Sequence, residues 1–77
     1  MTAGAYVLVN AEVGTEDQVL KQVKEVQPYV KEAYIVYGVY DLIIKVEADN
    51  MTDLKDIITE RIRKIDLVRS TLTMILM

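Results

Sequence analysis

The 77-residue chain contains no cysteine and no histidine, and its five aromatic residues are all tyrosines. Without cysteine the chain has no disulfide framework and no thiolate nucleophile, and the usual zinc sites are excluded as well. The missing histidine removes the commonest general base near neutral pH. These absences disfavour an enzyme, and we expect neither a cofactor nor a metal.

The charge and hydropathy of the chain also disfavour two classes of partner, nucleic acids and membranes. A net charge of −3 disfavours nonspecific attraction to a phosphate backbone, so no direct contact with nucleic acid is expected. No apolar run approaches the ~20 residues that a membrane span requires, so no membrane partner is expected. No basic segment precedes the strand-like stretch that begins at Ala5, which predicts no signal peptide and a cytoplasmic location.

Periodicity and turn residues predict four strands and two helices in one domain over residues 1–77. The predicted strands are Ala5 to Val13, Val30 to Val36, Leu42 to Ala48 and Val68 to Met77. The first helix should begin with a capping box from Thr15 to Gln18, and the second with an N-cap at Asp49 or Asn50. This order predicts the ferredoxin-like α+β fold, βαββαβ, in which both helices cover one face of a four-stranded antiparallel sheet.

The predicted strands carry large apolar residues on both faces. In the first strand Tyr6 and Leu8 point to one face, and the other face takes Ala5, Val7, Val9 and Ala11. Alternation assigns one face of the last strand to Val68, Leu72, Met74 and Leu76. A sheet with one face in water should instead alternate apolar and polar residues. We therefore expect a second copy to cover the free face, most simply as a symmetric homodimer packed sheet to sheet.

The stretch YGVYDLIIKV, from Tyr37 to Val46, interrupts two apolar segments with a glycine and an acid. As a hairpin turn it needs no function, because Gly38 supplies a positive φ and Asp41 accepts hydrogen bonds from nearby amides. The tyrosines near this turn also suggest a base-stacking surface for RNA. That alternative lacks the basic residue that precedes glycine in the RNA-recognition signature, and the acidic charge disfavours it.

One combination of motifs resembles a known family. Gly38-x-Tyr40-Asp41 before an apolar strand, then a helix, then Val68-x-x-Thr71-x-Thr73, resembles the RAM domain. RAM is the effector-sensing half of Lrp/AsnC-type, or feast/famine, transcription regulators, and the resemblance covers essentially the whole chain. Their helix-turn-helix half is missing from the sequence, so we expect a stand-alone RAM protein. Asp66-Leu67 stands where the family often has Pro-Gly, so the turn into the last strand should be built differently.

The resemblance implies a non-catalytic amino-acid sensor whose dimers assemble into rings, often octamers or decamers. It also implies that the module acts with full-length Lrp/AsnC-type regulators or buffers the effector. The implied effector site lies between dimers, near the hairpin loop of one subunit and the last strand of another. Its residues are Gly38, Val39, Tyr40 and Asp41 from the hairpin, and Ser70, Thr71 and Thr73 from the strand.

The chemistry of these residues suits an amino acid. The Asp41 carboxylate is a partner for the ammonium group, through a charge-assisted hydrogen bond. Gly38 allows the backbone to approach a ligand closely. Thr71 and Thr73 are two positions apart, so both hydroxyls lie on one face of a strand and Ser70 on the other.

Two other interpretations remain open from the sequence. An ACT-type regulatory domain has the same strand order and binds amino acids at the loop that here is Val13 to Glu16. An α+β-barrel dimer enzyme would enclose a pocket within one dimer.

Overall fold

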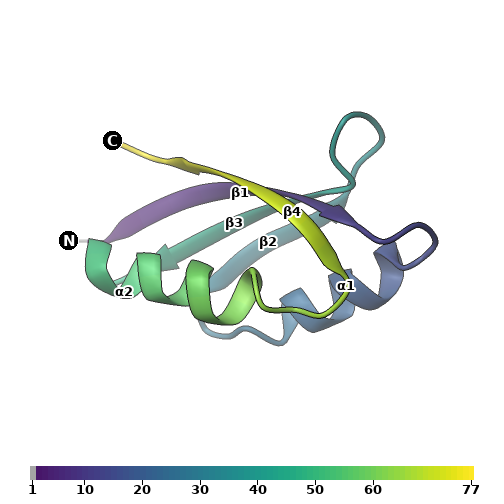
Figure 1. The fold of residues 1–77 in the computed structure, drawn as a ribbon. Helices are drawn as coiled ribbons and strands as arrows, with labels where there is room; N and C mark the ends of the chain where they lie inside the picture. The colour runs from purple at the N-terminus through teal and green to yellow at the C-terminus, as the bar shows by residue number, and fades with distance from the viewer. Residues whose placement is uncertain (1) are drawn as a thin grey trace.

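The computed structural model describes residues 2–77 and confirms the predicted ferredoxin-like α+β fold. Its elements are β1 (Ala3–Ala11), α1 (Glu16–Lys24), β2 (Val30–Ile35), β3 (Leu42–Ala48), α2 (Met51–Ile57), the π-helical segment η1 (Ile58–Ile62) and β4 (Val68–Ile75). The four strands form one antiparallel sheet in the order β2-β3-β1-β4. Both helices lie on the same side of this sheet (Figure 1).

The core lies between the sheet and the helices. Alternate residues of the two central strands point into it, and Val7, Val9 and Ile44 are completely buried. The helices contribute Val19 and Leu54 from the other side, which are equally buried. Burying one such side chain stabilises the fold by roughly 1.5–3 kcal/mol, so this layer holds the sheet in place.

The end of β1 differs from the prediction. The strand ends at Ala11 instead of Val13, because the chain turns where the Thr15 amide donates to the Glu12 carbonyl at 3.0 Å. Gly14 has a φ of +81°, the left-handed conformation that glycine adopts without a steric penalty. The predicted capping box is wrong: the Thr15 hydroxyl donates to the Glu12 carbonyl at 2.6 Å and makes no bond to the helix. The hydroxyl thus stabilises the turn instead of α1.

The second helix begins as predicted and then widens. Asn50 is its N-cap, and its side-chain oxygen accepts a hydrogen bond from the Asp53 amide at 2.8 Å. Further along, the Arg63 amide donates to the Ile58 carbonyl five residues earlier, at 3.0 Å, which is the π-helical pattern. Ile57, Ile58 and Ile62 are all buried in this region, so the segment still faces the core. None of the helices among residues 2–77 is long and apolar enough to cross a membrane.

The start of β4 contains a β-bulge. Asn10 pairs with Ser70, but the next residue of β1, Ala11, pairs with Val68, so Arg69 is an extra residue in β4. Because of this shift Val68 packs against the core. The prediction that Val68 shares a face with Leu72, Met74 and Leu76 is therefore wrong, since simple alternation does not survive a bulge.

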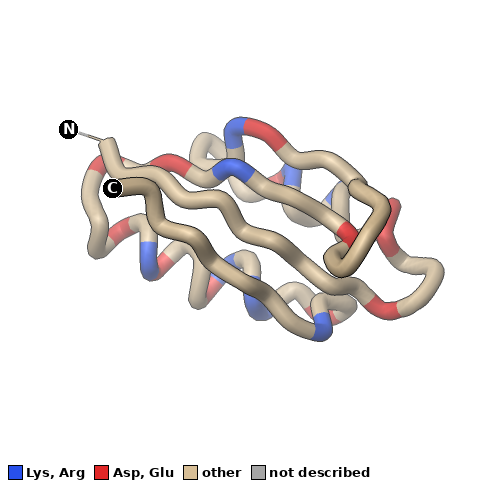
Figure 2. Tube along the Cα trace, turned by 90° about the horizontal axis from the view of Figure 1, so that it is seen from above, with Lys and Arg blue, Asp and Glu red and all other residues tan. Residues whose placement is uncertain are grey.

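The face of the sheet away from the helices is apolar along β1 and β4. The register places Leu8 beside Leu72 and Tyr6 beside Met74, and Leu76 follows at the end of the strand. Leu72 and Met74 are 46% and 45% exposed. Figure 2 looks onto this face and shows no charged residue along β1. We call Tyr6, Leu8, Leu72, Met74 and Leu76 the apolar stripe.

Toward β2 the same face becomes polar. Lys45 forms an ion pair with Glu47 at 3.5 Å, and its ammonium lies 5.1 Å from the centre of the Tyr6 ring. The Tyr34 hydroxyl donates to Glu32 at 2.9 Å, and this bond with the negative charge of Glu32 raises the pKa of Tyr34 above its ordinary value. The free face is thus divided into an apolar half and a polar half.

Candidate functional site

The β2–β3 connection rises from the sheet on the side opposite the helices (Figure 1). The Val36 amide closes it by donating to the Asp41 carbonyl at 2.8 Å, while Tyr37 and Val39 are fully or almost fully exposed. The predicted positive φ at Gly38 is wrong, because Gly14 is the glycine among residues 2–77 that has one. Apart from its two chain neighbours, a Cβ on Gly38 would meet no atom of residues 2–77 within 4 Å. Nothing within the described part of the chain therefore requires glycine at position 38.

Asp41 attaches the hairpin to the end of β1. Its amide donates to the Val9 carbonyl at 2.9 Å, and its Oδ2 accepts a hydrogen bond from the Ala11 amide at 2.9 Å. The capping role that the turn pattern predicted is therefore present, although the capped amide belongs to β1. The side chain is half-buried, and within residues 2–77 no hydrogen bond reaches Oδ1. A carboxylate accepts several hydrogen bonds, so Asp41 retains capacity for a ligand.

An open depression of about 440 Å³ lies beside Asp41, at the end of the sheet where β1 stops and β4 begins. Its lining residues are Asn10, Ala11, Val13, Asp41, Arg69 and Ser70. It brings together two predicted site residues, Asp41 and Ser70, which lie on opposite sides of β1. The Asn10 amide donates to the Ser70 hydroxyl at 3.2 Å across the β1–β4 pair. The carboxylate of Asp41, the guanidinium of Arg69, the amide of Asn10 and the hydroxyl of Ser70 thus belong to residues that line one open depression.

The two threonines lie on the other side of β4. Thr71 pairs with Val9 and Thr73 with Val7, and both valines point into the core, so the threonines share the helix side of the sheet. Ser70 faces the opposite side, as predicted. Thr71 lines a second depression of about 290 Å³, with Arg63, Val68, Arg69 and Ser70. Thr73 lines neither depression, so the structure separates the predicted strand residues into two groups.

The hairpin residues Gly38, Val39 and Tyr40 line neither of these depressions. Conversely, Asn10 and Arg69 line the depression but were not predicted from the sequence. Asn10 is a polar residue near the end of the otherwise apolar strand AGAYVLVNA, and Arg69 is the one charged residue of VRSTLTMI. The contrast of each with the rest of its strand is the signal that could have identified them.

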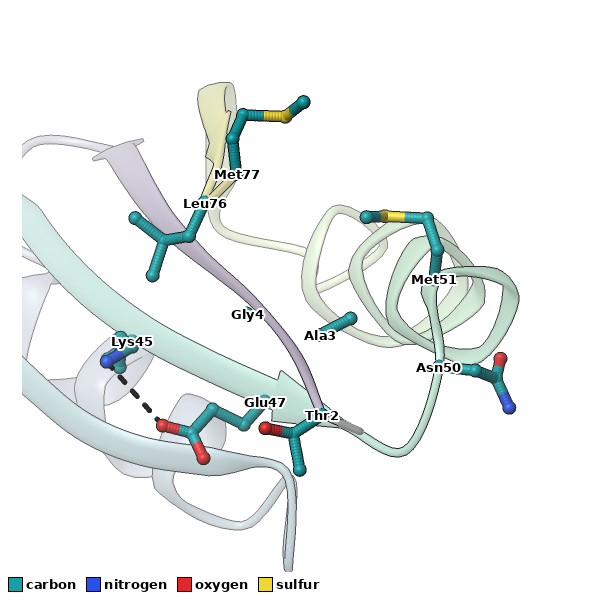
Figure 3. Close-up of a pocket in the computed structure, with 9 residues that line it drawn as sticks. All are labelled: Thr2, Ala3, Gly4, Lys45, Glu47, Asn50, Met51, Leu76 and Met77. Atoms are coloured by element: carbon teal, nitrogen blue, oxygen red, sulfur yellow. Dashed lines mark ion pairs between the residues drawn. The ribbon is translucent and has the colours of Figure 1, made fainter.

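A larger depression of about 600 Å³ lies at the opposite end of the sheet, near the C-terminus (Figure 3). Leu76 and Met77 extend beyond β4 on one side of it, and Met51 at the start of α2 lies on another. Its charged side chains, Lys45 and Glu47, form an ion pair with each other. It contains none of the predicted site residues, so the smaller depression beside Asp41 is the better candidate site. Within residues 2–77 no three acidic side chains cluster closely enough to hold a metal ion.

The fold is that of a small α+β domain with an open polar depression at one end of its sheet. The family model of the Lrp/AsnC ligand binding domain matches residues 4–77. The chain therefore belongs to the Lrp/AsnC family, which confirms the resemblance drawn from the G-x-Y-D and V-x-x-T-x-T motifs. The match favours an Lrp/AsnC-type regulatory domain over the ACT-type and barrel-enzyme alternatives.

Solved structures and curated proteins agree with this assignment. An FFRP protein is 45% identical with a TM-score of 0.92, and covers 97% of this chain and 99% of its own. A hypothetical protein from Pyrococcus horikoshii is also 45% identical, with a TM-score of 0.90 and coverage of 100% and 90%. An uncharacterized HTH-type transcriptional regulator of Pyrococcus furiosus is 36% identical over 61 residues, 79% of this chain and 40% of that protein. The chain thus spans less than half the length of the curated regulator that it matches.

Proposed function

We propose that this chain is a non-catalytic amino-acid sensor that works as an oligomer and modulates transcription regulators of the Lrp/AsnC type. The observation that carries the proposal is the half-buried carboxylate of Asp41. Its Oδ2 accepts a hydrogen bond from the Ala11 amide, and within residues 2–77 its Oδ1 accepts none. The residue lines a polar depression in which a ligand could reach Oδ1. Membership of a family of ligand-binding domains supports the same conclusion.

The ligand chemistry follows from the groups at this end of the sheet. An amino acid carries an ammonium and a carboxylate, and burying either without a partner costs several kcal/mol. Asp41 supplies the partner for the ammonium, and Ser70 supplies a hydroxyl on the same side of the sheet. In this proposal the exposed hairpin residues Gly38, Val39 and Tyr40 close over the ligand. Apart from its two chain neighbours, no residue among 2–77 comes within 4 Å of a Cβ placed on Gly38, which supports a close approach by a ligand or another subunit.

Thr71 and Thr73 are proposed to contact a ligand that is bound mainly by a neighbouring subunit. Both face the helix side of β4, away from the Asp41 depression of their own chain. They are therefore assigned to the wall of a site that a neighbouring subunit's hairpin completes. β4 is an edge strand, so its helix side is accessible from beyond the sheet.

A distant structural neighbour supports an amino acid as the ligand class. A transcriptional regulator from Neisseria meningitidis was solved as a complex with L-methionine. Its TM-score with this chain is 0.82 over 97% of the chain, at 10% sequence identity. At that identity the likeness extends to the fold alone, and it supports the view that this fold accommodates an amino acid.

The apolar stripe supports the oligomeric part of the proposal. It is continuous across β1 and β4, and contiguous exposed apolar surface of this kind is typical of interaction sites. A symmetric homodimer would bury one stripe against another. Assembly of dimers into an octameric or decameric ring, a cytoplasmic location and co-assembly with full-length regulators are supported by the family alone.

Calorimetry with each standard L-amino acid tests the proposed function, with the D-enantiomers as matched controls. We expect at least one L-amino acid to bind with a dissociation constant of about 1 µM to 1 mM, equivalent to −8 to −4 kcal/mol. At a concentration 100 times the dissociation constant it should add about 2.7 kcal/mol to the free energy of unfolding, which raises Tm measurably. Folded protein that gives no heat and no rise in Tm with any L-amino acid would contradict the proposal.

A further inference from the structure

The β-bulge at the start of β4 gives Arg69 an unusual place. Ser70 and Val68 pair with consecutive residues of β1. Arg69, which lies between them in the sequence, therefore has no partner in β1 and does not follow the regular alternation of the strand. Bulges of this type redirect a side chain and are common beside functional sites. Here Arg69 lines both the Asp41 depression and the Thr71 depression, and Ser70 is the other residue common to the two.

Arg69 also has no charged partner within residues 2–77. The ion pairs there are Lys45–Glu47 and Lys64–Glu60. Arg61 instead lies over the ring of Tyr29, 5.9 Å from its centre. Arg63 lines the second depression with Arg69 and is likewise without an ion pair in this part of the chain. The guanidinium groups of Arg69 and Arg63 thus have no ion-pair partner among residues 2–77, so Arg69 can accept an anion.

The separation of Arg69 from Asp41 suits a zwitterion. Asp41 precedes β3 and Arg69 lies in β4, on either side of β1, so their backbones are about two strand spacings, or roughly 10 Å, apart. The long side chain of arginine covers much of this distance, and a ligand over the end of β1 would lie between the two charges. A phosphate in the same depression would meet the Asp41 carboxylate as a like charge, which disfavours it.

We propose that Arg69 binds the α-carboxylate of the amino-acid effector while Asp41 binds its ammonium, an inference that rests on the proposed function. Guanidinium and carboxylate form two parallel hydrogen bonds, which fix orientation as well as affinity. Asn10 lies on β1, the strand between those of the two charged groups, and its amide donates to the hydroxyl of Ser70, the residue next to Arg69. The pair of opposite charges makes the site selective for molecules that retain both an ammonium and a carboxylate.

The test is a calorimetric cycle on the full chain. Wild type and Arg69→Ala are each titrated with the L-amino acid that wild type binds and with its α-carboxamide, which keeps the ammonium but has no negative charge. Arg69→Ala should weaken binding of the acid about 10- to 100-fold, the range expected for a hydrogen bond to a charged group. The same substitution should change binding of the carboxamide less than about threefold, because Arg69 has no anion to bind there.

Two matched variants serve as controls. Arg61→Ala removes the same side chain from the helix side of the molecule and should leave both affinities unchanged. Arg63→Ala should lower the affinity for the amino acid less than Arg69→Ala does, because Arg63 does not line the Asp41 depression. Unchanged affinity in Arg69→Ala would overturn the assignment of Arg69 and leave the amino-acid sensor standing. If Arg69→Ala lowers the affinities for the acid and the carboxamide equally, the effect is structural and the assignment of Arg69 is also overturned. If neither ligand binds the wild type, both proposals are overturned.

Discussion

Replacing Asp41 with asparagine should lower the affinity for the amino-acid effector about 10- to 100-fold while leaving the stability of the fold nearly unchanged. The reason is that the two oxygens of Asp41 have different partners. Oδ2 accepts the Ala11 amide at 2.9 Å, and an asparagine carbonyl oxygen can take over that bond. The negative charge that would bind an ammonium is lost. Calorimetry gives the affinity, and thermal denaturation gives the stability.

Asp41→Ala is the matched comparison. It removes both functions, so it should weaken binding at least as much as Asp41→Asn. It should also lower the free energy of unfolding by about 1–2 kcal/mol, because the Ala11 amide is left without its partner. For a domain of this size that is a fall in Tm of about 4–8 °C per kcal/mol. If Asp41→Asn binds the effector as tightly as wild type, the Asp41 carboxylate caps β1 and does not bind the ligand.

Replacing Leu72 with aspartate should convert the proposed sheet-to-sheet oligomer into the 8.8 kDa monomer. Leu72 is 46% exposed in the single chain and lies beside Leu8 in the middle of the apolar stripe. In a sheet-to-sheet dimer the new carboxylate would be buried against apolar side chains without a partner, which costs several kcal/mol for each copy. Sedimentation velocity of wild type and variant at equal concentration measures the change.

The control for this experiment places the same charge on the other side of the molecule. Thr59 is exposed in η1, on the helix side of the sheet, so Thr59→Asp should leave the assembly intact. A Leu72→Asp variant that sediments like wild type would show that the apolar stripe is not the dimer interface. A wild type that is itself a folded monomer at micromolar concentration would refute the oligomer directly.

The fold was predictable because its determinants are local. The alternation of buried residues in β1 and β3 and the N-cap at Asn50 depend on neighbours only a few positions away. The capping box failed because the Thr15 hydroxyl had a competing acceptor, the carbonyl of Glu12, in the preceding turn. Such competition between nearby backbone groups is not visible in a four-residue pattern.

The site was less predictable because it depends on long-range register. Asp41 and Ser70 were proposed from their turn and strand, but their meeting in one depression depends on the strand order β3-β1-β4. Arg69 was missed because its position follows from a bulge, and a bulge is determined by the pairing of β4 with β1. The same bulge moved Val68 to the core side, so one irregularity explains both errors.

The most direct test of amino-acid binding beside Asp41 is the structure of a crystal grown in a mixture of the standard L-amino acids. We expect an amino acid bound at the end of the sheet, with its ammonium at Asp41 and its carboxylate at Arg69. We also expect the hairpin of Gly38, Val39 and Tyr40 to be closed near the ligand. An amino acid bound instead at the Val13 to Glu16 loop, or in the depression beside Leu76 and Met77, would contradict this expectation.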